Sequence, residues 1–220
     1  MTLWPYVVPW GDTAFTGVLA LCIAGVLLLG GYRAQAIRWL AAYTAGSALI
    51  LFGKWAFDLG GWYAPSLAFY SISGHAMQTT AVYPLLFMMV GSASGASGAR
   101  WGLRLGFAAS AFMGWTLVAG DYHTLSEVIA GMAVGAGVVF SYARWRPALR
   151  PAHLCVLVAL PLSMAWLVDT HAWVDPAKAT LWQRAAVWAG ATQRFVRRIE
   201  TDPADGRQRV WVRRLQTVPH

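Results

Sequence analysis

Long uncharged stretches recur along the chain, and short stretches that carry charged residues separate them. Six of the uncharged stretches come close to the length and apolar character of membrane-spanning helices, which need about 20 mainly apolar residues. They cover residues 13–32, 39–53, 75–91, 105–120, 128–143 and 151–168. Residues 54–74 hold proline, several glycines and many aromatic side chains, which predicts a loop at the level of the lipid headgroups. The pattern therefore predicts an all-α fold, a polytopic helical membrane bundle of about six spans.

The composition points to the same class of protein. Hydrophobic residues make up 58% of the 220 positions and charged residues 12%, about half the charged fraction of an ordinary soluble domain. These values exclude a disordered chain. The two cysteines, Cys22 and Cys155, both lie inside apolar runs, so no disulfide framework is expected.

The placement of arginine predicts how the bundle is oriented. Arginines follow the first, third and fifth spans, at Arg33, Arg38, Arg100, Arg104, Arg144, Arg146 and Arg150. Loops rich in Lys and Arg stay on the cytoplasmic side of a membrane. The loops that carry Lys54 and Asp121 then face outward, so we expect an integral protein of a bacterial-type inner membrane with an extracytoplasmic active face.

The C-terminal part of the chain carries most of the net charge of +8. From Lys178 onward there are nine basic and three acidic residues. We expect a transmembrane bundle over residues 1–170, an interfacial amphipathic segment over 171–199 and a flexible basic tail over 200–220. The arginines of this tail are expected to bind acidic lipid headgroups. Nucleic acid is not an expected partner, because the tail is predicted to lie outside the cell.

Ionisable side chains in a membrane domain are costly, and they are functional candidates for that reason. Six such candidates fall on one predicted face of the bundle. They are Lys54, Asp58, His75, Asp121, His123 and Glu127. The sequence places small residues in the fifth span at Gly131, Gly135 and Gly137, where close helix packing is expected.

Ser73-Gly74-His75 opens the third span. The first N–H groups of a helix have no partner within it and lie at the positive end of its dipole, so they favour an anion such as phosphate. His75 lies where it would meet that anion. In the simpler interpretation, Ser73 caps the helix, Gly74 is a turn residue and His75 is an interfacial side chain.

His123 and Glu127 are four residues apart, hence on one face of a helix. A carboxylate there can hold one imidazole nitrogen and leave the other free to attack. The simpler interpretation is an ion pair at a helix start. Two further alternatives are a metal triad built on the two histidines, and a serine nucleophile at Ser71 or Ser73.

The order Lys54, then "SISGHAM", then "YHTLSEVIAG" resembles the type 2 phosphatidic acid phosphatase superfamily, over a core of about residues 54–139. The family pattern is K-x6-R-P, then P-S-G-H, then S-R-x5-H-x3-D. The resemblance implies that His123 is the nucleophile, Glu127 its orienting carboxylate and His75 the general acid. Lys54 would bind the phosphate of a membrane lipid phosphate or diphosphate, with Ser73 and Gly74 completing the substrate site. No cofactor or metal is implied.

The chain departs from that pattern where the family has arginine. Gly61-Trp62 stands in place of Arg-Pro, and Thr116-Leu117 in place of Ser-Arg. Ile72 replaces a proline, and Glu127 replaces an aspartate. Losing one preorganised donor to a reacting phosphoryl group costs about 10²–10³ in rate. The alternative to an enzyme is therefore a catalytically degenerate relative that binds lipid phosphate or a partner without turnover.

Overall fold

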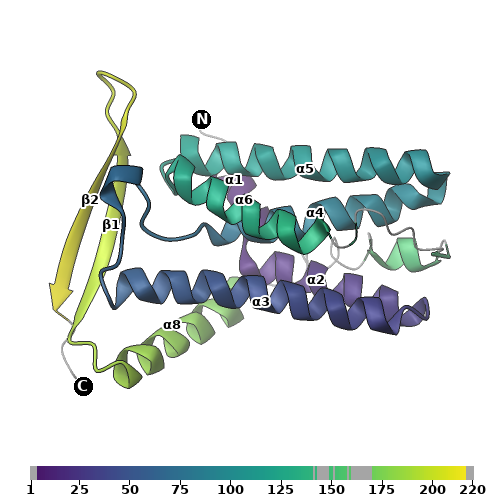
Figure 1. Cartoon of the computed structure of the whole chain (residues 1–220), viewed down its shortest axis with the longest axis horizontal. Helices are drawn as coiled ribbons and strands as arrows, with labels where there is room; N and C mark the ends of the chain where they lie inside the picture. The colour runs from purple at the N-terminus through teal and green to yellow at the C-terminus, as the bar shows by residue number, and fades with distance from the viewer. Residues whose placement is uncertain are drawn as a thin grey trace.

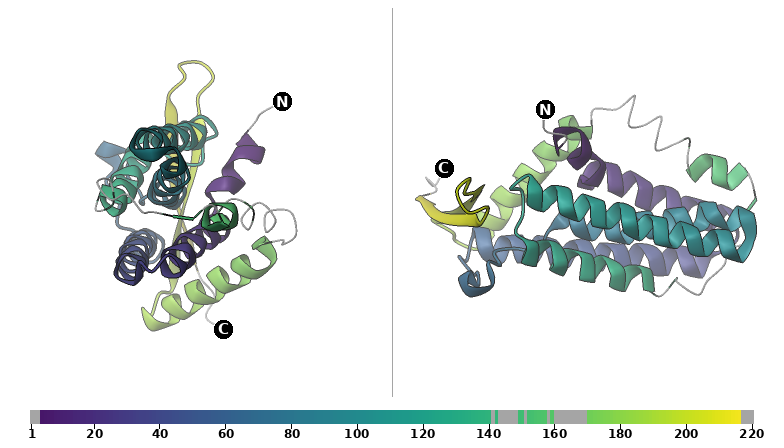
Figure 2. Two further views of the ribbon diagram at one scale, coloured as in Figure 1. Left: turned by 90° about the vertical axis from the view of Figure 1, so that its right-hand side faces the viewer. Right: turned by 90° about the horizontal axis from the view of Figure 1, so that it is seen from above.

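A computed structural model describes residues 4–140, 142, 149–150, 152–157, 159 and 170–216. The helical elements are α1 (Trp4–Val7), η1 (Val8–Gly11), α2 (Thr13–Leu29), α3 (Arg33–Asp58), η2 (Pro65–Leu67), α4 (Gly74–Gly91), η3 (Ser92–Ser94), α5 (Gly95–Ala119), α6 (Leu125–Phe140) and α8 (Thr170–Trp188). Two strands follow, β1 (Gln193–Thr201) and β2 (Gln208–Gln216). In Figure 1 the long helices run side by side, and the β1–β2 hairpin stands across one end of the bundle, here called the hairpin end; the right-hand view of Figure 2 shows the hairpin at the same end.

The mainly helical character agrees with the prediction, and five of the six expected spans correspond to α2, α3, α4, α5 and α6. Two helical stretches are long and apolar enough to cross a membrane, Arg33–Asp58 and Gly74–Ala119, and two shorter apolar helices are Thr13–Leu29 and Leu125–Phe140. Most of the sixth expected span, residues 151–168, lies outside the described residues.

Helix α4 is the centre of the bundle, because glycines let its neighbours approach its backbone closely. A Cβ on Gly131 of α6 would lie 2.4 Å from the carbonyl oxygen of Ser73, and one on Gly135 would lie 2.4 Å from that of Met77. These contacts confirm the packing role expected of both glycines. Among the described residues, nothing lies within 4 Å of the Cβ position of Gly137, so no close packing is observed there.

Replacing Gly131 with alanine is therefore expected to push α6 away from the start of α4. Overpacking of this kind costs about 1–3 kcal/mol, so thermal unfolding in detergent should move to lower temperature. Gly137→Ala is the matched control on the same helix, and its better helix propensity should leave the midpoint unchanged or higher. Equal destabilisation by the two variants would contradict this packing arrangement.

Helix α3 extends further than the sequence pattern predicted. It continues to Asp58, so Lys54 lies in the last two turns of a helix rather than in a loop. The charged residues Lys54 and Asp58 do not end the helix, because Lys54 is exposed and Asp58 lies 3.9 Å from Arg194. The chain leaves the helical path at Gly60 and Gly61, and Gly61 has a φ of +64°, a conformation that glycine adopts without strain.

The C-terminal region corrects a second expectation. Residues 193–216 form an antiparallel hairpin, with Gln193 opposite Gln216 and Thr201 opposite Gln208, where an amphipathic segment followed by a flexible tail was expected. Aromatic and β-branched residues, which favour strands, are frequent in both strands, but they stand in runs such as Phe195-Val196 and Val210-Trp211-Val212 and do not alternate with arginine. The high charge of the segment and the lack of a period of two concealed the strands.

Candidate active site at the hairpin end

His123 and Glu127 form the centre of the candidate site. Helix α5 ends at Ala119, and the chain turns back so that the His123 N–H donates to the Leu117 carbonyl at 3.1 Å. Glu127 lies in the first turn of α6. The His123 Nδ1 lies 2.8 Å from Glu127 Oε2, and the Glu127 side chain is fully buried. The contact expected from the four-residue spacing is thus present.

The Glu127 carboxylate is surrounded by donors. Its Oε1 accepts from the N–H groups of Tyr70 at 3.1 Å and Ser71 at 3.0 Å, and its Oε2 accepts from the Thr124 N–H at 3.3 Å. An ionised carboxylate only accepts hydrogen bonds. We therefore assign the proton of His123 to Nδ1, where it is donated to Glu127, which leaves the lone pair on Nε2 for chemistry.

The start of α4 lies beside this pair. Ser73 caps the helix, since its Oγ accepts from the Ala76 N–H at 3.4 Å, and its own N–H donates to the Glu127 carbonyl at 3.1 Å. Ser73 is therefore a helix cap, as the simpler interpretation expected. The hydrogen bond from its N–H to Glu127 connects the start of α4 to α6. His75 is half-buried against Gly11, on which a Cβ would lie 3.2 Å from His75 Cδ2. His75 is also within electrostatic reach of His123.

Two lysines border the site from different helices. Lys54 of α3 is exposed and within electrostatic reach of both histidines. Lys178 of α8 donates to Asp12 Oδ1 at 3.2 Å, and Asp12 is the N-cap of α2. The sequence analysis singled out Lys54, whereas it did not associate Asp12 or Lys178 with the site. No motif in the sequence connects α8 to these residues.

Arg197 of β1 is the largest addition to the expected site. Its Nη1 donates to Glu127 Oε1, and its guanidinium is 5.8 Å from the centre of the Tyr70 ring. Its Nη2 lies 3.0 Å from His123 Nδ1, and because that nitrogen already donates to Glu127, the contact places a positive charge beside the ring without a hydrogen bond. Burial lowers the pKa of Arg197 to about 10, so it stays a cation near neutral pH. Burial and the positive charges of Arg197 and Lys54 lower the pKa of His123 to about 3. The imidazole is therefore neutral at physiological pH.

The hairpin is held in place on both sides of Arg197. Asp121 accepts from the Thr201 N–H at 3.1 Å and from the Thr201 Oγ1 at 2.7 Å. The Gln208 amide also donates to Asp121, at 3.1 Å. On the other side, the Phe195 ring lies against Gly61, where a Cβ would be 2.7 Å from the ring. Asp121 thus contributes to the site by anchoring the hairpin.

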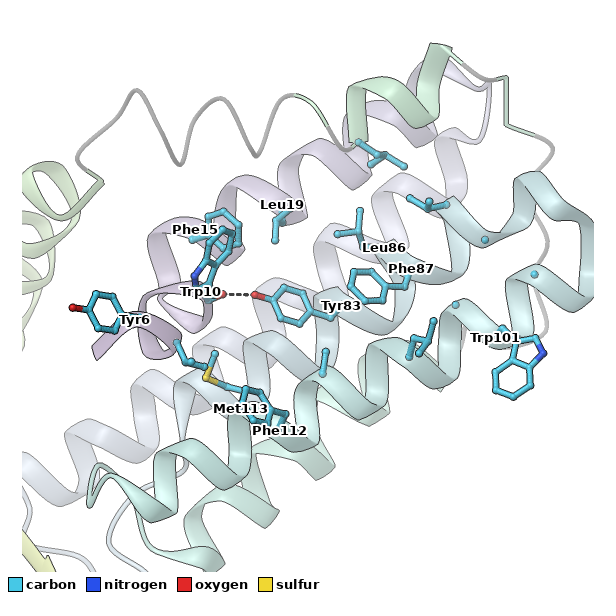
Figure 3. Close-up of a pocket in the computed structure, with 18 residues that line it drawn as sticks. Tyr6, Trp10, Phe15, Leu19, Tyr83, Leu86, Phe87, Trp101, Phe112 and Met113 are labelled. Atoms are coloured by element: carbon cyan, nitrogen blue, oxygen red, sulfur yellow. Dashed lines mark hydrogen bonds between the residues drawn. The ribbon is translucent and has the colours of Figure 1, made fainter. Parts of the chain in front are cut away.

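An apolar groove of about 720 Å³ lies along the bundle, and Figure 3 shows the residues that line it. Its walls come from α1, η1, α2, α4, α5 and the segment that holds Leu157, and they include Trp10, Met113 and Trp101. The Tyr83 hydroxyl donates to the Trp10 carbonyl at 2.5 Å within it. Met113 also packs against Gly11, the neighbour of His75. The groove therefore begins next to the polar site.

The sequence left two other kinds of site open, a serine nucleophile at Ser71 or Ser73 and a metal triad. The Ser73 side chain serves as a helix cap, and the Ser71 N–H donates to Glu127. Over residues 4–140 and the other described parts, no three His, Cys, Asp or Glu side chains gather as metal ligands.

Fold and site together define a mainly helical protein, with two membrane-length apolar stretches and a buried histidine–carboxylate–arginine cluster at one end of the bundle. Comparison of the chain with protein-family models, curated proteins and solved structures finds no match. The resemblance to the phosphatidic acid phosphatases therefore rests on the motifs and on the geometry described above.

Proposed function

We propose that this chain is an integral-membrane phosphatase or phosphotransferase of the type 2 phosphatidic acid phosphatase kind, acting on a lipid phosphate through a phosphohistidine. The observation that carries the proposal is the 2.8 Å contact of His123 Nδ1 with a fully buried carboxylate. That contact orients a neutral imidazole with a free Nε2. His75 and Lys54, from two other helices, lie within electrostatic reach of the same ring.

The proposed reaction has two balanced steps. First, His123 Nε2 forms a bond to phosphorus while the bond from phosphorus to the lipid oxygen breaks. His75, which takes up a proton as the phosphoryl dianion binds beside it, gives that proton to the leaving oxygen. Second, water attacks the phosphohistidine, His75 takes a proton from the water, and inorganic phosphate leaves. An alcohol in place of water would make the same chemistry a headgroup transfer. Lys54 neutralises phosphoryl charge in both steps.

The membrane placement belongs to the same proposal. Six spans would set the hairpin end at the extracytoplasmic surface, with α8 at the interface. Exposed aromatic and apolar side chains at the hairpin end support its placement at the membrane surface. They include Trp62 in the loop after α3, and Val187 and Trp188 at the end of α8. Tryptophan is enriched where a protein crosses from lipid to water.

The apolar groove supports a lipid as the substrate. It starts beside Gly11 and His75 and continues along α5 from Met113 to Gly98, which is about 22 Å of helix. A hydrocarbon chain in the groove would hold its phosphate headgroup near His75. Each buried methylene contributes about 0.8 kcal/mol, so such a site favours substrates with long chains.

The test is phosphate release by the full-length protein in detergent with EDTA present. We expect turnover of dioctanoyl phosphatidic acid well above that of p-nitrophenyl phosphate, because only the former has chains for the groove. Ala109→Phe fills the groove and should lower kcat/KM for the lipid about tenfold while sparing the small substrate. Ala108→Phe, on the exposed side of α5, is the matched control.

Lipid binding without phosphate release would contradict the enzymatic proposal and favour the degenerate relative. Loss of release in EDTA would contradict the metal-independent mechanism. An equal effect of Ala109→Phe on both substrates would contradict the role given to the groove.

A further inference from the structure

We propose that the C-terminal hairpin is part of the active site, and that Arg197 acts as a positioning residue that holds Glu127 and places a positive charge beside His123. This inference rests on the proposed function and adds a residue to it from outside the helical bundle. The starting observation is the contact of one guanidinium with both members of the His123–Glu127 pair.

Phe195 of the hairpin lies against position 61, where the resembled pattern has its first arginine. Counted from Lys54, the first arginine of the resembled pattern falls on Gly61. A Cβ at Gly61 would lie 2.7 Å from the Phe195 ring, and real side chains do not approach so closely. A side chain at position 61 would therefore require the Phe195 ring to move from its present place on the bundle.

The second arginine position is equally closed. Counted back from His123, the Ser-Arg pair falls on Thr116 and Leu117. Thr116 is buried and its Oγ1 donates to the Met113 carbonyl at 2.7 Å, while Leu117 is fully buried in the apolar core. Neither position offers a cation. Among the described residues, Arg197 is the arginine that contacts the His123–Glu127 pair.

The strand geometry fixes Arg197 between two anchors. Residues 195, 197 and 201 lie on one face of β1, because side chains alternate along a strand. Phe195 is seated on Gly61, and Thr201, about 20 Å further along the strand, is bound to Asp121. Asp121 lies two residues before His123, so the anchor and the proposed nucleophile belong to one turn.

The charges around the ring suit a phosphate. Within the described residues, the charged and titratable groups near His123 are Glu127 from α6, Arg197 from β1, Lys54 from α3 and His75 from α4. Asp58 of α3 lies within electrostatic reach of both cations. Lys54 and Arg197 are the positive charges that would meet a phosphoryl dianion at the ring. Positive charge beside the ring also keeps it neutral, and a neutral ring is the form that attacks phosphorus.

The experiment compares full-length variants on dioctanoyl phosphatidic acid. Arg197→Ala should lower kcat about 10²–10³-fold with a smaller change in KM, as for the loss of one preorganised charge, and Arg197→Lys should restore part of it. Arg198→Ala, the neighbouring arginine whose side chain is 77% exposed, is the matched control and should retain wild-type rates.

The pH profile separates this role from a merely structural one. Removing the positive charge raises the pKa of His123 towards its ordinary value. As the pH falls, the ring of the variant is therefore protonated at a higher pH than that of the wild type. The acid limb of kcat/KM should therefore move to higher pH in Arg197→Gln relative to the wild type. Both proteins are measured with the same substrate, so its ionisation affects the two profiles equally. Arg198→Ala should show no such shift.

Where Arg197→Ala does not fold, Thr201→Val combined with Gln208→Ala carries the test, since it loosens the anchor at Asp121 without touching Glu127. It should lower kcat at least tenfold. Wild-type rates and an unshifted acid limb in these hairpin variants would overturn the inference and leave the proposed function standing. A wild-type protein without phosphate release would overturn the proposed function and this inference with it.

Discussion

His123→Ala is expected to abolish phosphate release by the full-length protein, with kcat falling about 10⁴-fold or more. Removing a nucleophile from a catalytic unit costs this much because the remaining groups have nothing to act upon. His75 lies on α4 and His123 in the turn between α5 and α6, and in the proposed reaction His75 meets the leaving oxygen and not the phosphorus. The measurement is the initial rate of phosphate release from dioctanoyl phosphatidic acid, followed down to the rate of a protein-free control.

Two companion variants make that result specific. His75→Ala should be impaired about 10²–10⁴-fold, the usual worth of a general acid, and it should still form an acid-labile phosphoenzyme with a labelled substrate. His153→Ala, in the helical segment 152–157, should behave as the wild type. Phosphate release by His123→Ala at more than a hundredth of the wild-type rate would remove His123 from the role of nucleophile.

Glu127→Gln is expected to lower both activity and stability. The buried carboxylate accepts from three backbone N–H groups, Arg197 and His123. An amide would turn two of its own donors towards these donors, and breaking a buried charged network costs about 3–5 kcal/mol. The imidazole would also lose its orienting acceptor, which should lower kcat about 10³-fold or more.

Urea unfolding and initial rates measure the two effects of Glu127→Gln separately. Glu127→Asp keeps the charge and restores the acidic residue of the resembled motif, so it should recover part of the activity. Glu200→Gln, on a half-exposed carboxylate of β1, is the matched control. An unfolding midpoint equal to that of the wild type would show that the carboxylate network does not hold the hairpin end together.

Local pattern was sufficient for much of this fold. The boundaries of α4 were predicted within one residue, because the Ser73 cap and the following apolar run are both local signals. The His123–Glu127 contact was predicted from a spacing of four residues on one helix face. The contact is present, but His123 lies in the bend before α6 and not on the helix itself. Gly131 and Gly135 were expected at packing positions, although the sequence did not say which helix they would meet.

Other parts depend on partners distant along the chain. A strand such as β1 is specified by its pairing with β2 and by the surface beneath it, and neither is visible in the order of its own residues. The basic composition of the tail favoured a solvated segment until Phe195 and Thr201 had surfaces to contact. The extent of α3 likewise depended on whether the end of the helix could place Lys54 and Asp58 in a polar environment.

The amino-acid sequence by itself determined the mainly helical, strongly apolar bundle and the ionisable residues gathered towards one of its ends. Those features follow from composition and short-range periodicity, which act within a few residues. Only the tertiary structure decided that Arg197, seventy residues after Glu127, reaches the His123–Glu127 pair. A contact across such a separation is set by the docking of a folded hairpin on the bundle, because the free energy of that contact arises only when both surfaces exist.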